Sequence, residues 1–198
     1  MVKNAPQNAL AHLQLAIVLN QMARREEAVA SYQAALRLFP ENAVALMQLG
    51  NLYLQLNNPE AALDCFQKAS AAQPSYAPAH NALGEFFAYK RQARTVAKQH
   101  FLHALRLDPD FIPALNNFAN LAMASASYTE AAGYFMRVLA LDPKFVPAYG
   151  NLAFIYSLQG RTAKARSFLN RALQVDPQNA RLKGMLEQIE ASEKAKTN

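Results

Sequence analysis

The stretch AVALMQLGNLYLQLNNPEAALDCFQKASAAQP, residues 43–74, contains the pattern that decides the fold. Its first half places Leu46, Leu49 and Tyr53 on one face of a helix, because residues three, four and seven positions apart share a helical face. The segment 56–59, Leu-Asn-Asn-Pro, then predicts a turn. In the second half, residues 62, 63, 66 and 69 form another apolar stripe, which ends before Pro74. The stretch therefore predicts two antiparallel helices joined by a short turn.

Two small residues in this stretch indicate how the helices meet. Gly50 lies in the first predicted helix and Ala62 in the second. Two helix backbones approach closely only where no large side chain stands between them. We therefore expect Gly50 and Ala62 to mark the contact between the helices.

The same pattern recurs along the chain with a nearly constant period. Prolines recur at spacings of 34, 35, 34 and 34 residues, at Pro40, Pro74, Pro109, Pro143 and Pro177. Alanines follow the same spacings, at Ala28, Ala62, Ala97, Ala131 and Ala165. A third column of small residues keeps this period, at Ala16, Gly50, Gly84, Ala119 and Ala153. An internal period of this length indicates a tandem array. We predict a single array of five units, over about residues 9–42, 43–76, 77–111, 112–145 and 146–179.

One unit departs from the regular period. The third has an additional residue, which the columns place between Glu85 and Val96. After the fifth unit, Asn179 can cap a further helix, and the apolar residues Leu182, Leu186 and Ile189 share one face. We expect this helix, over about residues 180–192, to seal the last unit, and the tail after it to be frayed.

The columns resemble those of the tetratricopeptide repeat (TPR) family. The second unit matches that family's pattern at Leu49, Gly50, Tyr53, Ala62, Phe66, Ala69 and Pro74. The family's tryptophan is absent, and its column holds His12, Leu46, His80, Leu115 and Tyr149. The resemblance implies an all-α solenoid, a right-handed superhelix of antiparallel helix pairs. It also implies that the first helix of each pair lines a concave, peptide-binding face.

The amino-acid composition is typical of a folded chain and not of a disordered or membrane-spanning one. Apolar residues make up 52% of the 198 residues and charged residues 17%, which argues against a disordered chain. No stretch reaches the roughly 20 apolar residues of a membrane helix, so membrane insertion is not expected. Cys65 is the sole cysteine, so no disulfide forms within the chain. A cytoplasmic location is expected, or a periplasmic one if a leader was removed.

The five predicted first helices are almost free of charge. Residues 9–22, 43–57, 77–89, 112–124 and 146–158 contain one charged side chain, Glu85. The predicted inward-facing positions instead hold amides, at Gln14, Gln48, Asn51, Asn81, Asn116, Asn117, Asn120 and Asn151. An amide side chain carries both a donor and an acceptor, so it can pair with the backbone of an extended peptide. We expect Glu85, Tyr89 and Phe154 to supply selectivity.

Two further observations bear on this groove. Asn117 and Asn151 occupy one column and are similar to the asparagine ladder in the TPR arm of O-linked N-acetylglucosamine transferase, although Gln14, Gln48 and Ala82 stand in the other units. The chaperone-binding branch of the family grips a carboxylate with Lys and Arg on these columns, and here the columns hold neither. The alternative interpretation is that the amides are tolerated on a solvated helix face.

Other chemistry finds little support in the sequence. The chain has no phosphate loop, nucleophile elbow or HExxH motif, so we predict neither enzymatic activity nor a cofactor. His100 and His103 lie one helical turn apart, but no further ligand is near in sequence, so we predict no metal site. Cys65 has no neighbouring histidine to activate it and is interpreted as an inert thiol.

Basic residues gather at the irregular third unit. Lys90, Arg91, Arg94 and Lys98 form this basic surface cluster. A solvated turn is the first interpretation, and a contact with an acidic partner or with nucleic acid is the second. We do not expect nucleic acid to be the partner.

The sequence as a whole predicts a scaffold that binds an extended peptide segment of another protein. One alternative is the substrate-recruiting arm of a larger, glycosyltransferase-like enzyme. A second is an array that self-assembles into a homo-oligomer, or an adaptor in pilus or secretion assembly.

Overall fold

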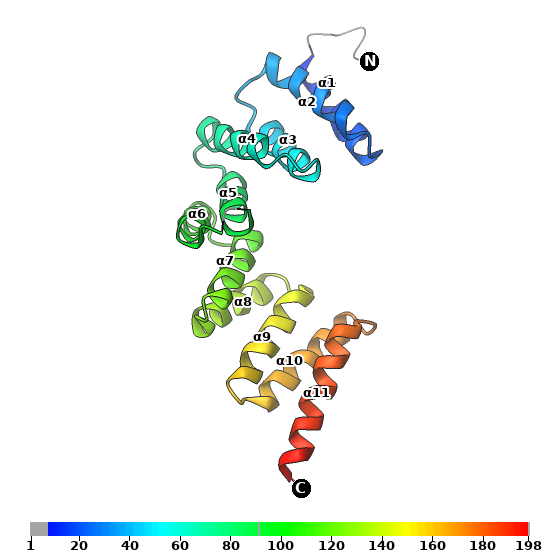
Figure 1. Cartoon of the computed structure of the whole chain (residues 1–198), viewed down its shortest axis with the longest axis vertical. Coiled ribbons are helices and arrows are strands. Elements are labelled where there is room, and N and C mark those ends of the chain that lie inside the picture. The colour runs from blue at the N-terminus through cyan, green and yellow to red at the C-terminus, as the bar shows by residue number, and fades with distance from the viewer. Residues whose placement is uncertain (1–7, 91, 198) are drawn as a thin grey trace. The chain divides into compact units, whose positions relative to one another are not determined.

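The computed structural model describes residues 8–90 and 92–197, with side chains as far as residue 191, and within them the fold is all-α. The helices follow one another along the chain in the order of the predicted repeats (Figure 1). The described residues form α1 (Ala9–Gln21), α2 (Arg25–Leu38), α3 (Ala43–Gln55), α4 (Pro59–Ala72), α5 (Ala77–Tyr89), α6 (Arg94–Leu107), α7 (Ile112–Ala124), α8 (Tyr128–Leu141), α9 (Val146–Leu158), α10 (Thr162–Val175) and α11 (Ala180–Thr197).

The described helices pack as five antiparallel pairs followed by α11, which confirms the predicted all-α fold of antiparallel helix pairs. The pairs are α1 with α2, α3 with α4, α5 with α6, α7 with α8, and α9 with α10. The chain forms two compact units. The first unit, residues 1–109, holds α1 to α6, and the second, residues 110–198, holds α7 to α11.

Helix starts are set by capping side chains and prolines. The Oδ1 atoms of Asn8, Asn42 and Asn58 accept hydrogen bonds from backbone N–H groups in the first turns of α1, α3 and α4. Such a bond satisfies a donor that has no partner within the helix. Helices α5, α7 and α9 instead have proline near their first residue, where its missing N–H is not needed.

In the α3–α4 and α5–α6 pairs, a glycine on the first helix faces a large residue on the second. A Cβ atom added to Gly50 would lie 2.5 Å from Cε1 of Phe66, and one added to Gly84 would lie 2.5 Å from Cε1 of Phe101. The large residues of this column are buried in all five pairs, as Tyr32, Phe66, Phe101, Phe135 and Leu169. The small column therefore admits the large side chain that fills the core of each pair.

Successive pairs in the first unit share their cores. Leu49 and Leu52 of α3 pack into one buried cluster with Ala16 and Tyr32 of the preceding pair. Phe66 of α4 packs into a second cluster that includes Leu83 of α5. Burying a side chain of this size contributes about 1.5–3 kcal/mol. Each pair is thus stabilised by its neighbour, as expected for a repeat array.

The turns inside the pairs locate the inserted residue. Each turn has one residue with positive φ, at Ala23, Asn57, Gln92, Ala126 and Gly160. In four turns the closing hydrogen bond runs to a carbonyl five residues back, as from the N–H of Asn58 to Tyr53. In the third turn the N–H of Ala93 donates to Phe87, six residues back. The insertion therefore falls between Phe87 and Ala93, inside the range predicted from the sequence.

The last helix is longer than expected. The Oδ1 atom of Asn179 accepts from the N–H of Leu182, which confirms the predicted cap. Leu182 and Ile189 are buried, as the apolar pattern indicated. The helix continues to Thr197, beyond the predicted end at about residue 192. The segment 191–197 contains alanine, glutamate and lysine without glycine or proline, and these residues favour helix.

A pair of glycine substitutions tests the contact inside the helix pairs. We expect Gly84→Ala to lower the free energy of unfolding by about 1 kcal/mol or more, because the buried Phe101 ring must move. The matched control is Gly133→Ala in α8, where an added Cβ meets nothing within 4 Å. This control should raise the free energy of unfolding by about 0.5–1 kcal/mol, the usual gain in helix propensity. Urea unfolding followed by circular dichroism measures both, and equal effects would contradict the proposed contact.

Candidate functional site

The first helices of the pairs expose one narrow face, which we call the inner strip. On α3 this face consists of Val44, Gln48, Asn51 and Gln55, and all four are exposed. Their spacing of four, three and four residues places them along a single line on the helix. The same register positions on α1 are Leu10, Gln14, Ile17 and Gln21, and these are exposed as well.

Within each compact unit, the same register positions on the other first helices have a different chemistry, and they too are called the inner strip. On α5 it consists of Pro78, Ala82, Glu85 and Tyr89, of which Tyr89 is 64% exposed. In the second unit α7 contributes Pro113, Asn117, Asn120 and Ala124, and α9 contributes Pro147, Asn151, Phe154 and Leu158. Phe154 is 44% exposed and Leu158 is 53% exposed. The strip therefore combines amides with exposed apolar side chains.

The structure links two of the predicted amides directly. The Nδ2 atom of Asn151 on α9 donates to the Oδ1 atom of Asn120 on α7 over 3.0 Å. Both side chains are half-buried, so the bond holds them in defined orientations. The bond leaves Nδ2 of Asn120 as a donor and Oδ1 of Asn151 as an acceptor.

Two predicted groove residues lie elsewhere. Asn81 is 7% exposed, and its Nδ2 donates to Oε1 of Glu85 over 3.0 Å. Asn116 is half-buried, and its Oδ1 is buried without a hydrogen-bond partner. Each lies one residue before a strip position, which turns its side chain about 100° around the helix, away from the strip. Asn81 is thus buried and Asn116 half-buried, and their assignment to the peptide-binding groove stays a prediction.

Sequence reasoning named Tyr89 and Phe154 but missed four other apolar residues of the inner strip. Leu10, Ile17 and Val44 are exposed in the first unit, and Leu158 in the second. Ile17 shares its register column with Asn51 and Asn120, and Leu158 shares its column with Gln21 and Gln55, so the period could have found these two. The strip is therefore more apolar than the amides alone suggested.

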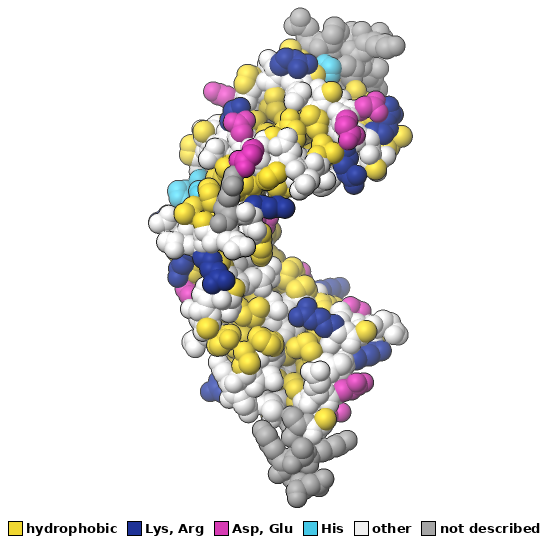
Figure 2. Space-filling model, in the orientation of Figure 1, with side chains coloured by type: hydrophobic (Ala, Val, Ile, Leu, Met, Phe, Trp, Pro, Cys, Tyr) yellow, Lys and Arg dark blue, Asp and Glu magenta, His cyan; other side chains and the backbone are white. Residues whose placement is uncertain are grey.

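Charged residues lie mainly outside the inner strip. Ion pairs join Arg24 to Glu27 at 2.6 Å and Lys68 to Asp64 at 2.7 Å. Of the predicted basic cluster, Lys90, Arg94 and Lys98 are exposed, and Arg91 lies outside the described residues. In the face drawn in Figure 2, basic and acidic side chains are interspersed within each unit. This dispersion gives no support to a nucleic-acid surface on that face.

Three histidines gather between α5 and α6, where Figure 2 shows a patch of histidine colour. The ring centre of His80 lies 4.1 Å from that of His103, and the His100 ring stacks on Phe87 at 5.5 Å. Burial, and then the neighbouring His80 and His103, lower the pKa of His100 from its ordinary value. Burial, and then His80 and Arg106, lower the pKa of His103. Among the described residues, no group of three or more His, Cys, Asp or Glu could hold a metal ion.

The thiol of Cys65 is buried beneath the ion pair of Asp64 and Lys68. Burial raises its pKa to about 11, and the Asp64 carboxylate adds to this rise. The thiol is therefore protonated at neutral pH and behaves as a small apolar side chain. This agrees with the interpretation of Cys65 as inert.

Three family models, each described as tetratricopeptide repeat, match residues 7–75, 47–110 and 122–189. The chain is a tetratricopeptide repeat protein. TPR arrays are protein–protein interaction domains that bind protein or peptide partners, and they are generally not catalytic. No helix in the described part of this TPR protein is long and apolar enough to span a membrane.

Solved structures of TPR proteins share the fold. PilF of Pseudomonas aeruginosa matches with a TM-score of 0.84 and 22% identity, over 96% of this chain and 86% of PilF. PilW, a type IV pilus biogenesis factor, matches with a TM-score of 0.77 and 23% identity, over 94% of this chain and 92% of PilW. YrrB, described as having an unusual peptide-binding site, matches with a TM-score of 0.68 and 23% identity, over 92% of this chain and 94% of YrrB. A search of curated protein sequences finds no significant match.

The histidine cluster predicts a pH dependence of stability. Because folding lowers the pKa of His100 and His103, the unfolded chain binds protons more tightly than the folded one. This contribution to stability is complete above their ordinary pKa of 6.5 and is lost as the pH falls through the lower folded values. We therefore expect the free energy of unfolding to be smaller at about pH 5 than at about pH 7.5.

The variant His100→Phe places in α6 the residue that stands at the same register position of α10, Phe168. It should lose less stability than the wild type between these two pH values. Urea unfolding at both pH values measures the difference. An equal loss of unfolding free energy in the variant and the wild type would show that the histidine cluster does not cause the pH dependence.

Proposed function

We propose that this TPR protein binds extended peptide segments of a partner protein along the inner strip. The observation that carries the proposal is the composition of the strip, which combines exposed amides on α1 and α3, half-buried amides on α7 and α9, and exposed apolar side chains, with Glu85 as its one charge. A strip without Lys or Arg offers nothing specific to a carboxylate or a phosphate. Its amides suit the neutral N–H and C=O groups that every peptide presents.

The amides are arranged in register along the first helices. Gln14 and Gln48 occupy one column in the first unit, and Asn117 and Asn151 occupy it in the second. The bond between Asn120 and Asn151 fixes a donor and an acceptor side by side before a peptide arrives. Less side-chain entropy is then lost on binding, which favours affinity.

The apolar residues of the strip would contribute most of the remaining affinity. Tyr89, Phe154 and Leu158 present the large exposed apolar surfaces near the ends of their helices. Each Å² of apolar surface that a peptide covers contributes about 25 cal/mol. Peptides that combine an extended backbone with apolar side chains should therefore bind best.

A peptide array tests this proposal. We expect the protein to select extended, apolar-containing peptides of about 12 residues, a length that spans roughly 40 Å. The variants Gln48→Ala with Asn51→Ala, and Asn120→Ala with Asn151→Ala, each remove two amides from the strip of one unit. Because a hydrogen bond contributes about 0.5–1.5 kcal/mol, each double variant should weaken a peptide bound by that unit about tenfold.

The matched control removes exposed amides from the second helices, with Gln67→Ala in α4 and Gln174→Ala in α10. This variant should bind the selected peptides as the wild type does. Fluorescence anisotropy on the best peptides measures all affinities. Unchanged affinity in both strip variants, or an equal loss in the control, would overturn the proposal.

A further inference from the structure

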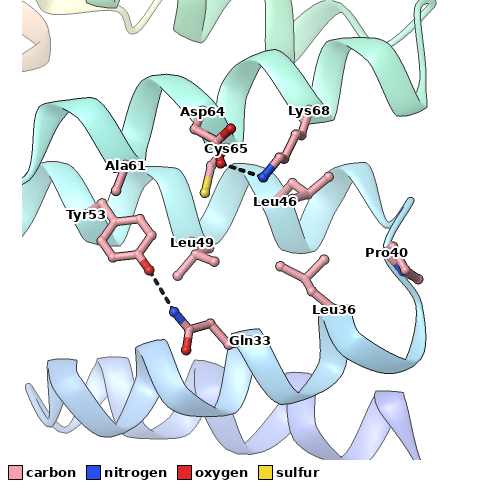
Figure 3. A pocket seen from close by; sticks show the side chains of 10 residues that line it. All are labelled: Gln33, Leu36, Pro40, Leu46, Leu49, Tyr53, Ala61, Asp64, Cys65 and Lys68. Carbon is pink, nitrogen blue, oxygen red and sulfur yellow. Dashed lines mark hydrogen bonds and ion pairs between the residues drawn. The ribbon is translucent and has the colours of Figure 1, made fainter.

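A cavity of about 360 Å³ opens between α2 and α4, with α3 as its floor (Figure 3). Apolar side chains form its base and polar ones surround it. The lining residues are Gln33, Leu36, Pro40, Leu46, Leu49, Tyr53, Ala61, Asp64, Cys65 and Lys68. All of them belong to the first unit, so the cavity is formed within one compact body.

The register of the repeats explains why there is a cavity here. Cys65 of α4 belongs to a column whose later members are His100, Tyr134 and Phe168. Each of these three rings packs on an aromatic residue of its own pair. His100 stacks on Phe87 at 5.5 Å, Tyr134 lies 4.6 Å from Phe118, and Phe168 stacks on Tyr156 at 5.4 Å. In the α3–α4 pair, the residue of this column is Cys65, whose side chain is a thiol and not a ring.

Tyr53 is the residue left without a stacking partner. It occupies the column of Phe87 and Tyr156, the two residues whose rings stack within 3° of parallel on His100 and Phe168. Among the described residues, the ring of Tyr53 has no aromatic neighbour, while its Oη accepts a hydrogen bond from Nε2 of Gln33 over 2.9 Å. Figure 3 shows this bond at one side of the cavity. The ring is therefore held in place beside the space that a ring fills in the later pairs.

Lys68 is a cation at the edge of this cavity, and its register position holds an arginine in two later pairs, where Arg137 contacts a ring of the Cys65 column and Arg171 a ring of the Leu46 column. Lys68 shares its column with Arg137 and Arg171. The guanidinium of Arg137 lies 6.0 Å from the centre of the Tyr134 ring, and that of Arg171 lies 5.4 Å from the centre of the Tyr149 ring. Lys68 is held by Asp64 at 2.7 Å, at the edge of the cavity. A ring in the cavity would thus lie near a cation, which an aromatic face attracts.

We propose that this cavity binds an aromatic side chain of a partner polypeptide, which supplies the ring that the column lacks at Cys65. The ring would stack on Tyr53 and rest on Leu46 and Leu49, with Lys68 beside it. The space is sufficient, because an apolar cavity of about 150 Å³ already binds benzene. The remaining volume leaves room for the atoms that join the ring to a chain.

This site is separate from the inner strip. Successive residues of a helix are about 100° apart, so Leu46, Leu49 and Tyr53 lie on the side of α3 opposite Gln48 and Asn51. A partner bound along the strip would leave the cavity accessible. The proposal therefore does not depend on the function proposed for the strip.

Three blocked amino acids serve as probes of the cavity, namely N-acetyl-tyrosinamide, N-acetyl-phenylalaninamide and N-acetyl-leucinamide. Each is titrated into the full-length ¹⁵N-labelled protein and followed by two-dimensional NMR. We expect the aromatic probes to shift the amides of Gln33, Leu49 and Cys65, and to bind at least threefold more tightly than the leucine probe. Equal binding of leucine, shifts confined to the inner strip, or no binding by any probe would overturn the proposal.

The variant Cys65→Phe installs in α4 the ring that α10 has at Phe168. It should weaken the aromatic probes at least tenfold and raise the midpoint of thermal unfolding. The matched variant Cys65→Ala leaves the cavity open and should bind them as the wild type does. Tyr53→Leu provides an independent test if Cys65→Phe does not fold, because it removes the stacking ring and should abolish the preference for aromatic probes. Gln48→Ala, on the inner strip, should leave probe binding unchanged, and unweakened binding to Cys65→Phe would contradict the proposal.

Discussion

The close contact between a small residue and a large one inside each helix pair is the constraint on which the rest of the structure depends. Gly50 lets the Phe66 ring lie against the backbone of α3, and Gly84 does the same for Phe101. The pair can then bury its large residue without a cavity, and its outer faces remain available to the next pair. Because the contact recurs at one period, every other residue acquires a fixed position relative to it. The inner strip and the aromatic columns are consequences of this register.

The register divides the first helix of a pair between two roles. One side of α3 carries the exposed amides Gln48 and Asn51, and the opposite side carries Leu49 and Tyr53, which face the second helices. In the α5–α6, α7–α8 and α9–α10 pairs, an aromatic ring of the second helix packs against this side of the first helix. In the α3–α4 pair the corresponding residue is Cys65, which has no ring, and a cavity lies there. A repeat array can thus acquire a new binding site when one large side chain is lost where two of its helix pairs meet.

Much of the fold could be predicted from the sequence because the small and large columns recur many times, and chance rarely repeats a spacing. The site was harder to predict. Asn81 and Asn116 were assigned to the groove from their register on the first helices, and the structure buries the Asn81 side chain. Their actual position depends on a rotation of about 100° around the helix, which only the exact register resolves. The cavity at Cys65 depends on a missing ring, and an absence becomes visible only when the columns are compared with their packing partners.

The central claim is that the small and large columns are matched in size, and a double-mutant cycle at Gly50 and Phe66 tests it most directly. The fifth pair carries Ala153 and Leu169 at these positions, both fully buried. Gly50→Ala and Phe66→Leu should each lower the free energy of unfolding, the first through overpacking and the second through lost burial. The double variant should lose at least about 1 kcal/mol less than the sum of the single losses, because the smaller side chain makes room for the added methyl group. Strictly additive losses would show that the two columns do not set each other's size.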